Sequence, residues 1–92
     1  MKFEWDHGKA RSNLAKHGVP FEYASFVFAD EGRIEELDDQ VAYGEERWKA
    51  VGLVHGRLYT VIYTQRVDSF RIISARRATR HEQQDYLHQN SS

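Results

Sequence analysis

The sequence predicts one α+β domain, spanning residues 1–92, with N-terminal helices, an antiparallel β-sheet of about four strands and a C-terminal helix. Three observations support this class: helical spacing of apolar residues near the N-terminus, three strand-like runs in the second half, and a helix-start motif near the end. At 92 residues with a 40% hydrophobic fraction, the chain has enough apolar side chains for one modest core.

The N-terminal region predicts a short strand followed by two helices. Phe3-Glu4-Trp5 alternates apolar and polar residues, as a strand does. Asp6 is a suitable N-cap for a helix over residues 7–17, and Gly18 suits the left-handed position that ends a helix. Pro20 fits the first turn of a second helix, where a missing N–H is harmless. Its core-facing residues are expected to be Phe21, Ala24, Val27 and Phe28.

The second half predicts a meander of three strands. Residues 46–54, 57–65 and 70–77 are rich in β-branched and aromatic residues. His55-Gly56 separates the first two runs, as a two-residue hairpin turn would. Residues 33–38 form the expected fourth strand. A polar loop containing Tyr43 and Gly44 lies between that strand and the meander, and the aromatic residues Trp5, Trp48, Tyr59 and Tyr63 are expected to pack in the core or sheet.

The end of the chain predicts a short helix. Thr79-Arg80-His81-Glu82 has the spacing of a capping box, in which the Thr hydroxyl and the Glu carboxylate satisfy each other's backbone N–H groups. We expect a helix from residue 80 to about 88, with Tyr86 and Leu87 available to dock. Residues 90–92 are expected to fray.

Charge is distributed unevenly along the chain. The formal net charge is only -1, which argues against a general nucleic-acid coat protein. Residues 1–46, however, carry 5 basic and 11 acidic side chains, whereas residues 47–92 carry 8 basic and 3 acidic ones. The halves therefore predict either a positive patch for an anionic partner or two solvated surfaces of opposite sign.

Composition also excludes several classes of protein. The chain has no cysteine, and therefore no disulfide or thiolate metal site. It has no apolar run near 18 residues, and its N-terminal MKFEWDHGK lacks the apolar region of a signal peptide, so we expect a cytoplasmic protein without membrane contact. The five histidines show no paired metal-ligand spacing, so neither a metal nor another cofactor is expected.

One face of the first predicted helix carries polar and basic groups. Lys9, Asn13, Lys16 and His17 are spaced i, i+4, i+7 and i+8, which places them on a common face. An imidazole can accept a proton near neutral pH, so this face is a candidate acid–base site. The alternative is a solvated helix face on which His17 favours the helix C-terminus as a cation.

A second basic group ends the last predicted strand. Strict alternation places Phe70, Ile72, Ser74 and Arg76 on one face of the strand, and Arg71, Ile73, Ala75 and Arg77 on the other. Guanidinium groups bind phosphate through paired hydrogen bonds, and a neighbouring helix N-terminus would assist. Arg47 and Lys49 add cations of equal parity from a neighbouring strand. The alternative is that these cations form salt bridges with the acidic segment 30–46.

Three stretches of the sequence resemble one known family. FEWDHGKARSNLAKHGVPFEYA (Phe3 to Ala24), GEERWKAVG (Gly44 to Gly52) and RIISARRATRHEQQDY (Arg71 to Tyr86) are similar, in this order, to the BrnT toxins. The departures are Pro20, where the family more often has Ser or Thr, and the divergent stretch 30–43. The resemblance implies a RelE-like fold and RNA cleavage that inhibits translation. It also implies a BrnA-type antitoxin whose ribbon-helix-helix domain binds operator DNA, in a 2:2 heterotetramer that represses its own operon.

These observations lead to a specific hypothesis of metal-independent RNA cleavage. The candidate catalytic residues are His17 as acid or base, Lys9 and Lys16 in support, and Arg76 at the phosphate. The candidate substrate-binding residues are Arg47, Lys49, Arg77 and Arg80. Glu82 is expected to act mainly as the helix cap. The alternative hypotheses are a non-catalytic binding module and a degenerate toxin that acts only within a repressor complex.

Overall fold

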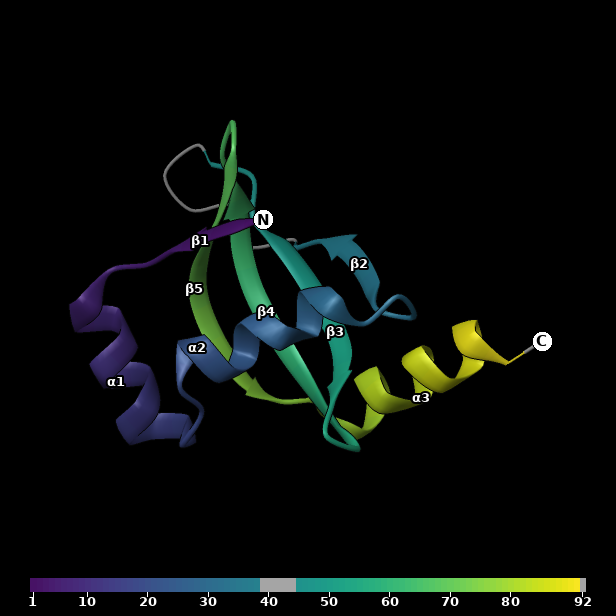
Figure 1. Cartoon of the computed structure of the whole chain (residues 1–92). Helices are drawn as coiled ribbons and strands as arrows, with labels where there is room; N and C mark the ends of the chain where they lie inside the picture. Colours follow the sequence, from purple (N-terminus) through teal and green to yellow (C-terminus); the bar gives the residue numbers. More distant parts are fainter. Residues whose placement is uncertain (39–44, 92) are drawn as a thin grey trace.

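The computed structural model describes residues 1–38 and 45–91 of the chain. They form one five-stranded sheet in the order β1-β5-β4-β3-β2, with helices on both faces (Figure 1). The strands are β1 (Lys2–Glu4), β2 (Ile34–Leu37), β3 (Trp48–Val54), β4 (Arg57–Gln65) and β5 (Ser69–Arg77). The helices are α1 (His7–His17), α2 (Phe21–Ala24), the 3-10 helix η1 (Ser25–Ala29) and α3 (Arg80–Asn90). The predicted loop around Tyr43 and Gly44 lies outside the described residues.

The expected antiparallel sheet is confirmed for the four strands β2 to β5, which pair in antiparallel fashion. The count of about four strands is too low, and the sheet is mixed, because β1 adds a fifth strand parallel to β5. Alternation at Phe3-Glu4-Trp5 identified a strand near this position, although the observed strand is Lys2–Glu4. Periodicity does not reveal which edge a three-residue strand will join.

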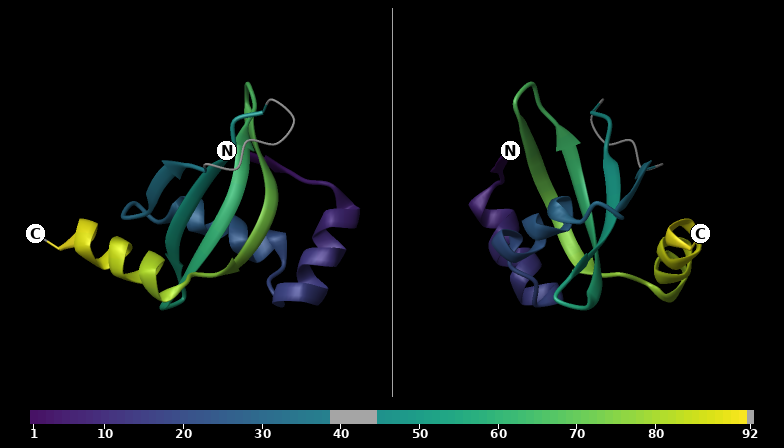
Figure 2. Two further views of the ribbon diagram at one scale, coloured as in Figure 1. Left: turned by 180° about the vertical axis from the view of Figure 1, so that it is seen from behind. Right: turned by 45° about the vertical axis from the view of Figure 1, so that its right-hand side comes forward.

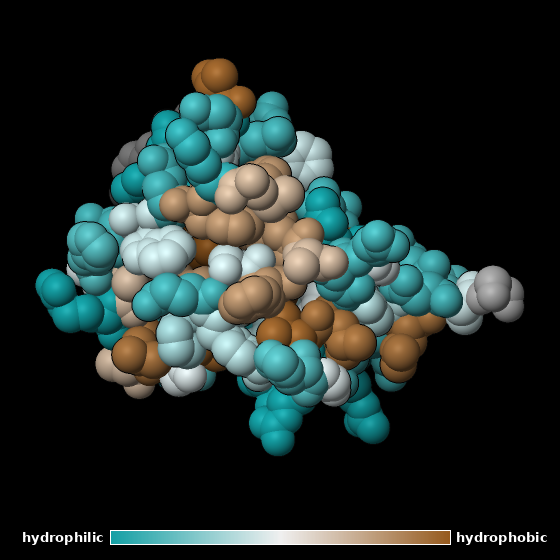
Figure 3. Space-filling model, viewed as in Figure 1, coloured by the Kyte–Doolittle hydropathy of each residue, from teal (hydrophilic) through white to brown (hydrophobic). Residues whose placement is uncertain are grey.

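The sheet separates two unequal layers. Helices α1 and α2 together with η1 lie on one side, and α3 lies on the other (Figure 2). The larger core is on the first side, where Phe21, Val27, Val61 and Ile72 are almost fully buried. Apolar side chains also reach the surface across the middle of this side (Figure 3). Phe26 of η1 is 60% exposed.

The predicted second helix is broken into two parts. An α-helical turn, α2, passes directly into η1, and the four residues expected to face the core are all buried. Pro20 precedes this helix as its N-cap and does not occupy its first turn. Helix η1 packs so closely on β3 that position 52 has room only for glycine. A Cβ at Gly52 would lie 2.7 Å from Cγ1 of Val27, so a larger residue would displace η1.

Helix α1 and the β3–β4 hairpin end as the sequence predicted. The Asp6 carboxylate accepts a hydrogen bond of 2.9 Å from the Lys9 N–H. Gly18 ends α1 with φ 71°, in the left-handed region where glycine carries no steric penalty. His55 and Gly56 both have positive φ, which matches the twist that a two-residue hairpin turn requires.

Helix α3 follows the predicted capping box but docks differently from the prediction. Tyr86 is buried and donates a 2.7 Å hydrogen bond to Asp30, whereas Leu87 is 62% exposed and does not dock. The helix also continues to Asn90, whose side chain donates a 2.8 Å hydrogen bond to the Gly32 carbonyl, so the expected fraying is wrong for Asn90, and Ser92 lies outside the described residues. The helix is held by polar contacts to the 30–32 turn that apolar periodicity cannot predict.

Strict alternation fails along β5 because a bulge interrupts its pairing with β4. The register passes from Ile62–Ser74 to Tyr63–Ile72, which leaves Ile73 as the extra residue. Ile72 and Ala75 therefore both face the larger core. Ser74 and Arg76, which were predicted on the same face as Phe70 and Ile72, therefore lie on the opposite face of the sheet.

Candidate active site

The face of the sheet that is turned toward α3 carries a group of cationic side chains. Arg76 and Arg71 come from β5, and Lys49 comes from β3. Arg47 directly precedes β3, where its carbonyl still accepts from the Asp38 N–H, so alternation places it on the same face as Lys49. We call Arg47, Lys49, Arg71 and Arg76 the basic sheet face. The expectation that these cations come from neighbouring strands is wrong, because β4 lies between β3 and β5.

Glu82 lies at the centre of the contacts on this face. Its carboxylate accepts hydrogen bonds from both terminal nitrogens of Arg76, at 2.7 and 2.9 Å, and from the Thr60 hydroxyl at 2.8 Å. It also accepts from the Thr79 N–H at 2.9 Å, which completes the predicted capping box. The side chain is only 7% exposed. Glu82 is therefore the helix cap that the sequence predicted and also the anchor of Arg76.

The electrostatics of Glu82 are set by its partners. Burial alone would raise the pKa of its carboxyl group, but the Arg76 guanidinium, the Thr79 N–H and the Thr60 hydroxyl outweigh that effect. The pKa is held well below its usual range, so Glu82 is a carboxylate at neutral pH. A carboxylate already occupies the N-terminus of α3, so this terminus is not free to hold a phosphate.

Arg76 is oriented but not fully used by these contacts. Three of its five N–H donors are engaged, two by Glu82 and one by the Arg77 carbonyl at 3.2 Å. The side chain remains 31% exposed, so the outer edge of the guanidinium reaches solvent. The hydrogen bonds to Glu82 raise the pKa of Arg76 against the effect of burial. Arg76 is thus a permanently charged, pre-oriented donor.

Arg77 points the other way, as neighbouring residues on a strand must. Its guanidinium carbon lies 5.6 Å from the centre of the Tyr59 ring, on the side that carries α2. The predicted divergence of Arg76 and Arg77 is therefore confirmed. Arg80, in the first turn of α3, is exposed. The structure therefore places Arg77 apart from the other three predicted phosphate-holding side chains of β3 and β5.

Lys49 forms one of the salt bridges to the acidic segment 30–46 that were predicted as the alternative to phosphate binding. Its ammonium lies 2.8 Å from Glu36 and 3.3 Å from Glu82. The hydrogen bond to Glu36 raises the pKa of Lys49, burial opposes it, and Glu82 adds to the increase. Glu36 belongs to the acidic segment 30–46, so that segment does pair with one of the candidate phosphate-binding cations. Arg76 instead pairs with Glu82, outside the segment.

Two polar atoms on this side of the sheet lack a partner among the residues that the structure describes. They are Nε of Arg47 and Oγ1 of Thr64, both fully shielded from solvent. Buried polar atoms are normally hydrogen-bonded, so these two are exceptions within the described residues.

The basic face of α1 forms one side of a hollow of about 490 Å³ beside β5. As predicted, its polar residues point to a common side, since Lys9, Asn13, Lys16 and His17 all line this hollow. Ile73 and Ser74 of β5 form the opposite wall. The structure therefore brings an imidazole and two ammonium groups to one surface cavity.

Asn13 fixes this helix face against the sheet. Its amide donates to the Ala75 carbonyl at 2.8 Å and accepts from the Ala75 N–H at 3.1 Å, in the manner of a neighbouring strand. It also donates to the Val19 carbonyl at 3.1 Å, and only 7% of it is exposed. Asn13 therefore satisfies the edge of β5 beyond the point where β1 ends and sets the register of α1.

The α1 hollow and the basic sheet face adjoin each other along β5. Ser74 lines the hollow, and Arg76 is the next residue on the same face of the strand. Two residues of extended chain span about 7 Å, close to the reach of a single nucleotide. The predicted acid–base group and the predicted phosphate-holding group therefore form one continuous surface.

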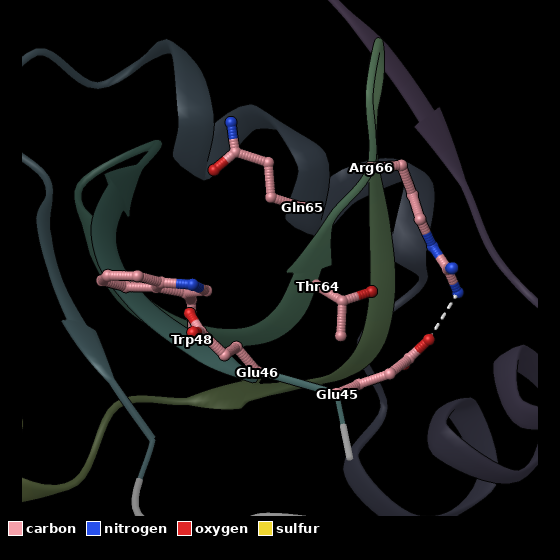
Figure 4. Close-up of a pocket in the computed structure, with 6 residues that line it drawn as sticks. All are labelled: Glu45, Glu46, Trp48, Thr64, Gln65 and Arg66. Carbon is pink, nitrogen blue, oxygen red and sulfur yellow. Dashed lines mark ion pairs between the residues drawn. The ribbon is translucent and has the colours of Figure 1, made fainter. Parts of the chain in front are cut away.

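A second hollow of about 450 Å³ lies at the other end of β3 and β4 (Figure 4). It is lined by Glu45, Glu46, Trp48, Thr64, Gln65 and Arg66. The only cation among them, Arg66, lies 3.1 Å from the Glu45 carboxylate. Two carboxylates on this wall repel phosphate, so this hollow is less suited to an anionic ligand than the α1 hollow.

The described residues contain no group of three His, Asp or Glu side chains placed to hold a metal ion. In the same part of the chain, no helix is both long and apolar enough to cross a membrane.

Sequence reasoning missed two residues of this site. Thr60 looks like an ordinary strand residue, and its role depends on α3 crossing over β4. Arg71 was assigned to the opposite face from Arg76, because a bulge has no clear signal in this sequence. A β-branched hydroxyl residue at the centre of an otherwise apolar strand was the only hint for Thr60.

The fold and the site together define a small α+β domain with a cationic sheet face beside an imidazole-lined hollow. The model of the ribonuclease toxin family BrnT, of type II toxin–antitoxin systems, matches residues 5–82. Since this match covers most of the chain, the protein belongs to the BrnT family, and the resemblance seen in the sequence is confirmed. No curated protein sequence matches the chain.

Proposed function

We propose that this toxin is a metal-independent endoribonuclease of RelE-like fold that cleaves RNA and thereby inhibits translation. The observation that supports this most directly is the continuity of the α1 hollow with the basic sheet face along β5. One surface then offers a proton acceptor beside Ser74 and a fixed cation at Arg76, two residues further along β5.

The reaction in this proposal needs no group from outside the chain. His17 accepts the proton of a ribose 2′-hydroxyl, whose oxygen attacks the adjacent phosphorus. The bond from phosphorus to the 5′-oxygen breaks, and that oxygen takes a proton from the His17 imidazolium, which leaves a 2′,3′-cyclic phosphate, a free 5′-hydroxyl and a neutral imidazole. Lys9 and Lys16 support the charge near His17, and Arg76 stabilises the negative charge that develops on the phosphorane oxygens.

The remaining cations hold the RNA strand on either side of the cleaved bond. Lys49 and Arg47 contact phosphates over the sheet, although Glu36 and Glu82 reduce the field at Lys49. Arg77 and Arg80 extend the positive surface past the end of β5. Such contacts position the substrate and carry little sequence information.

The first test is cleavage itself. Purified toxin is expected to cut single-stranded RNA equally well with and without EDTA, and to produce cyclic-phosphate and 5′-hydroxyl ends. End-labelled RNA on a denaturing gel measures the rate, and phosphatase and kinase treatment identifies the ends. Loss of cleavage in EDTA would contradict the metal-independent mechanism.

The second test isolates the imidazole. His17→Gln is expected to lower the cleavage rate by up to about 10²-fold, because glutamine forms hydrogen bonds but does not transfer the proton. The matched control is His7→Gln, since His7 is an exposed histidine at the opposite end of α1. Equal rates for the two variants would remove His17 from the mechanism.

The proposed partner is a BrnA-type antitoxin that binds operator DNA through a ribbon-helix-helix domain, in a 2:2 complex that represses its own operon. Membership of a type II family implies an antitoxin. We propose that acidic or apolar residues of the antitoxin cover the basic sheet face and block RNA. Amide exchange on antitoxin binding should show protection at β5 and α1.

One observation favours a second function. Glu82 and Glu36 already neutralise Arg76 and Lys49, which is typical of a structural ion-pair network. A non-catalytic module or a degenerate toxin acting only within a repressor complex would need no more than this. Harmless expression of the free toxin in growing cells, with antitoxin and operator binding retained, would favour that reading.

A further inference from the structure

Aromatic and cationic side chains also gather on the opposite side of the sheet, at the end where β5 stops. The β3–β4 turn and the C-terminal end of β5 lie together there (Figure 1). Tyr23 of α2 stacks on His55 of the turn, with ring centres 6.0 Å apart and planes inclined by 24°. We call Tyr23, His55, Arg57 and Arg77 the hairpin-end cluster.

The ring of Tyr23 packs on its inner side against Tyr59 of the core. Tyr59, which is buried in the core, meets it edge-on at 5.5 Å. Arg77 lies over the same Tyr59 ring at 5.6 Å. Arg57 lies two residues before Tyr59 on β4 and therefore on the same face of the strand. Burial and Tyr59 raise the pKa of Tyr23, whereas the charges of Arg57 and Arg77 lower it. The stack therefore rests on a rigid base with two cations beside it.

His55 occupies a left-handed backbone position. Its φ is 48°, a region in which two-residue turns of this kind most often have asparagine or glycine and in which histidine is also found more often than most residues. The His55 imidazole stacks on the Tyr23 ring, and His55 is also exposed to solvent.

We propose that the hairpin-end cluster binds a nucleotide of single-stranded RNA, with its base stacked on His55 and its phosphates held by Arg57 and Arg77. This rests on the proposed function, to which it adds a substrate subsite. Flat rings flanked by cations are the usual means of binding single strands without sequence preference. Arg76 and Arg77 lie on opposite faces of the sheet at the end of β5. An RNA strand bound at Arg76 would therefore reach the hairpin-end cluster by passing around this end of β5.

The test uses an oligonucleotide that cannot be cleaved. A labelled 2′-O-methyl RNA of about 8 nucleotides lacks the attacking hydroxyl, so fluorescence anisotropy measures binding alone. His55→Asn removes the ring but suits the turn, so the fold should persist, as the urea midpoint will verify. We expect its affinity to fall by about 5- to 30-fold, and this loss to disappear with an abasic oligonucleotide.

The cations have a separate signature. Arg57→Gln and Arg77→Gln should each reduce the slope of log affinity against log salt by about 0.7. The matched control is Lys2→Gln on β1, which pairs with the opposite end of β5 and should change affinity by less than about twofold. A salt slope that is the same in all three variants would overturn the cationic role.

Each outcome separates this proposal from the proposed cleavage. Unchanged affinity of His55→Asn for the intact oligonucleotide overturns the platform, even if the wild type cuts RNA. A loss in His55→Asn in a toxin that cuts no RNA supports the platform and contradicts the cleavage. Unchanged RNA affinity with weakened antitoxin binding would make the cluster a protein-docking surface and overturn the proposal.

Discussion

Replacing Arg76 with alanine is expected to lower the rate of RNA cleavage by about 10²- to 10³-fold, the usual cost of removing one pre-oriented donor from a developing oxyanion. Arg76 has the properties of such a donor, because Glu82 holds its plane through two hydrogen bonds while its outer edge stays exposed. Single-turnover kinetics with saturating enzyme would measure this loss in the chemical step.

Alanine at this position also leaves Glu82 without its main partner, so a conservative variant is needed. Arg76→Lys keeps the charge and an ion pair but loses the planar fork, and we expect an intermediate loss of rate with near-normal stability. Arg11→Lys is the matched control, because Arg11 is exposed on α1 and lines a different hollow, next to Trp5 and Pro20. Wild-type rates in both Arg76 variants would show that this residue has a structural role only.

Replacing Glu82 with alanine is expected to lower the free energy of unfolding by about 2–4 kcal/mol. Removal of one partner from a buried ion pair costs roughly 3–5 kcal/mol, and the partial exposure of Arg76 and Lys49 reduces this figure. The variant also loses the hydrogen bonds from the Thr79 N–H and the Thr60 hydroxyl to the carboxylate, whereas the backbone N–H of residue 82 can still donate to the Thr79 hydroxyl. A chain of this size is stable by roughly 5–14 kcal/mol, so urea unfolding should still show a folded state.

The control for Glu82 is Glu36→Ala. Glu36 also contacts Lys49, but its side chain is 62% exposed, so its loss should cost less than about 1 kcal/mol. Equal losses in the two variants would contradict the central role of Glu82 in the network.

The same residue links stability to pH. The pKa of Glu82 is lower in the folded state than its ordinary value of 4.5, so the folded protein releases this proton more readily than the unfolded chain. Its contribution is complete above pH 4.5 and is lost as pH falls towards the depressed pKa. The stability difference between wild type and Glu82→Gln should therefore be constant near neutral pH and shrink in acid. A constant difference down to pH 3 would contradict this.

Much of the candidate site was predictable because its signals are local. The capping box at Thr79 and Glu82, the helix face that carries His17, and the divergence of Arg76 and Arg77 each depend on spacing within a few residues. The partners were not predictable. Nothing in the local pattern shows that Arg76 binds Glu82, or that Asn13 binds the backbone of Ala75, 62 residues away.

The sequence by itself determined the class of fold, both ends of α1, the start of α3, the β3–β4 turn and the membership of the BrnT family. Caps, turns and periodicity act over one or two turns of chain, and a family match needs only residue order. Tertiary structure alone decided which face each cation occupies. The bulge at Ile73 moved Arg71 to the side of Arg76, and the crossing of α3 over β4 brought Thr60 to Glu82. Both depend on contacts between distant segments, where packing and hydrogen bonding override local alternation.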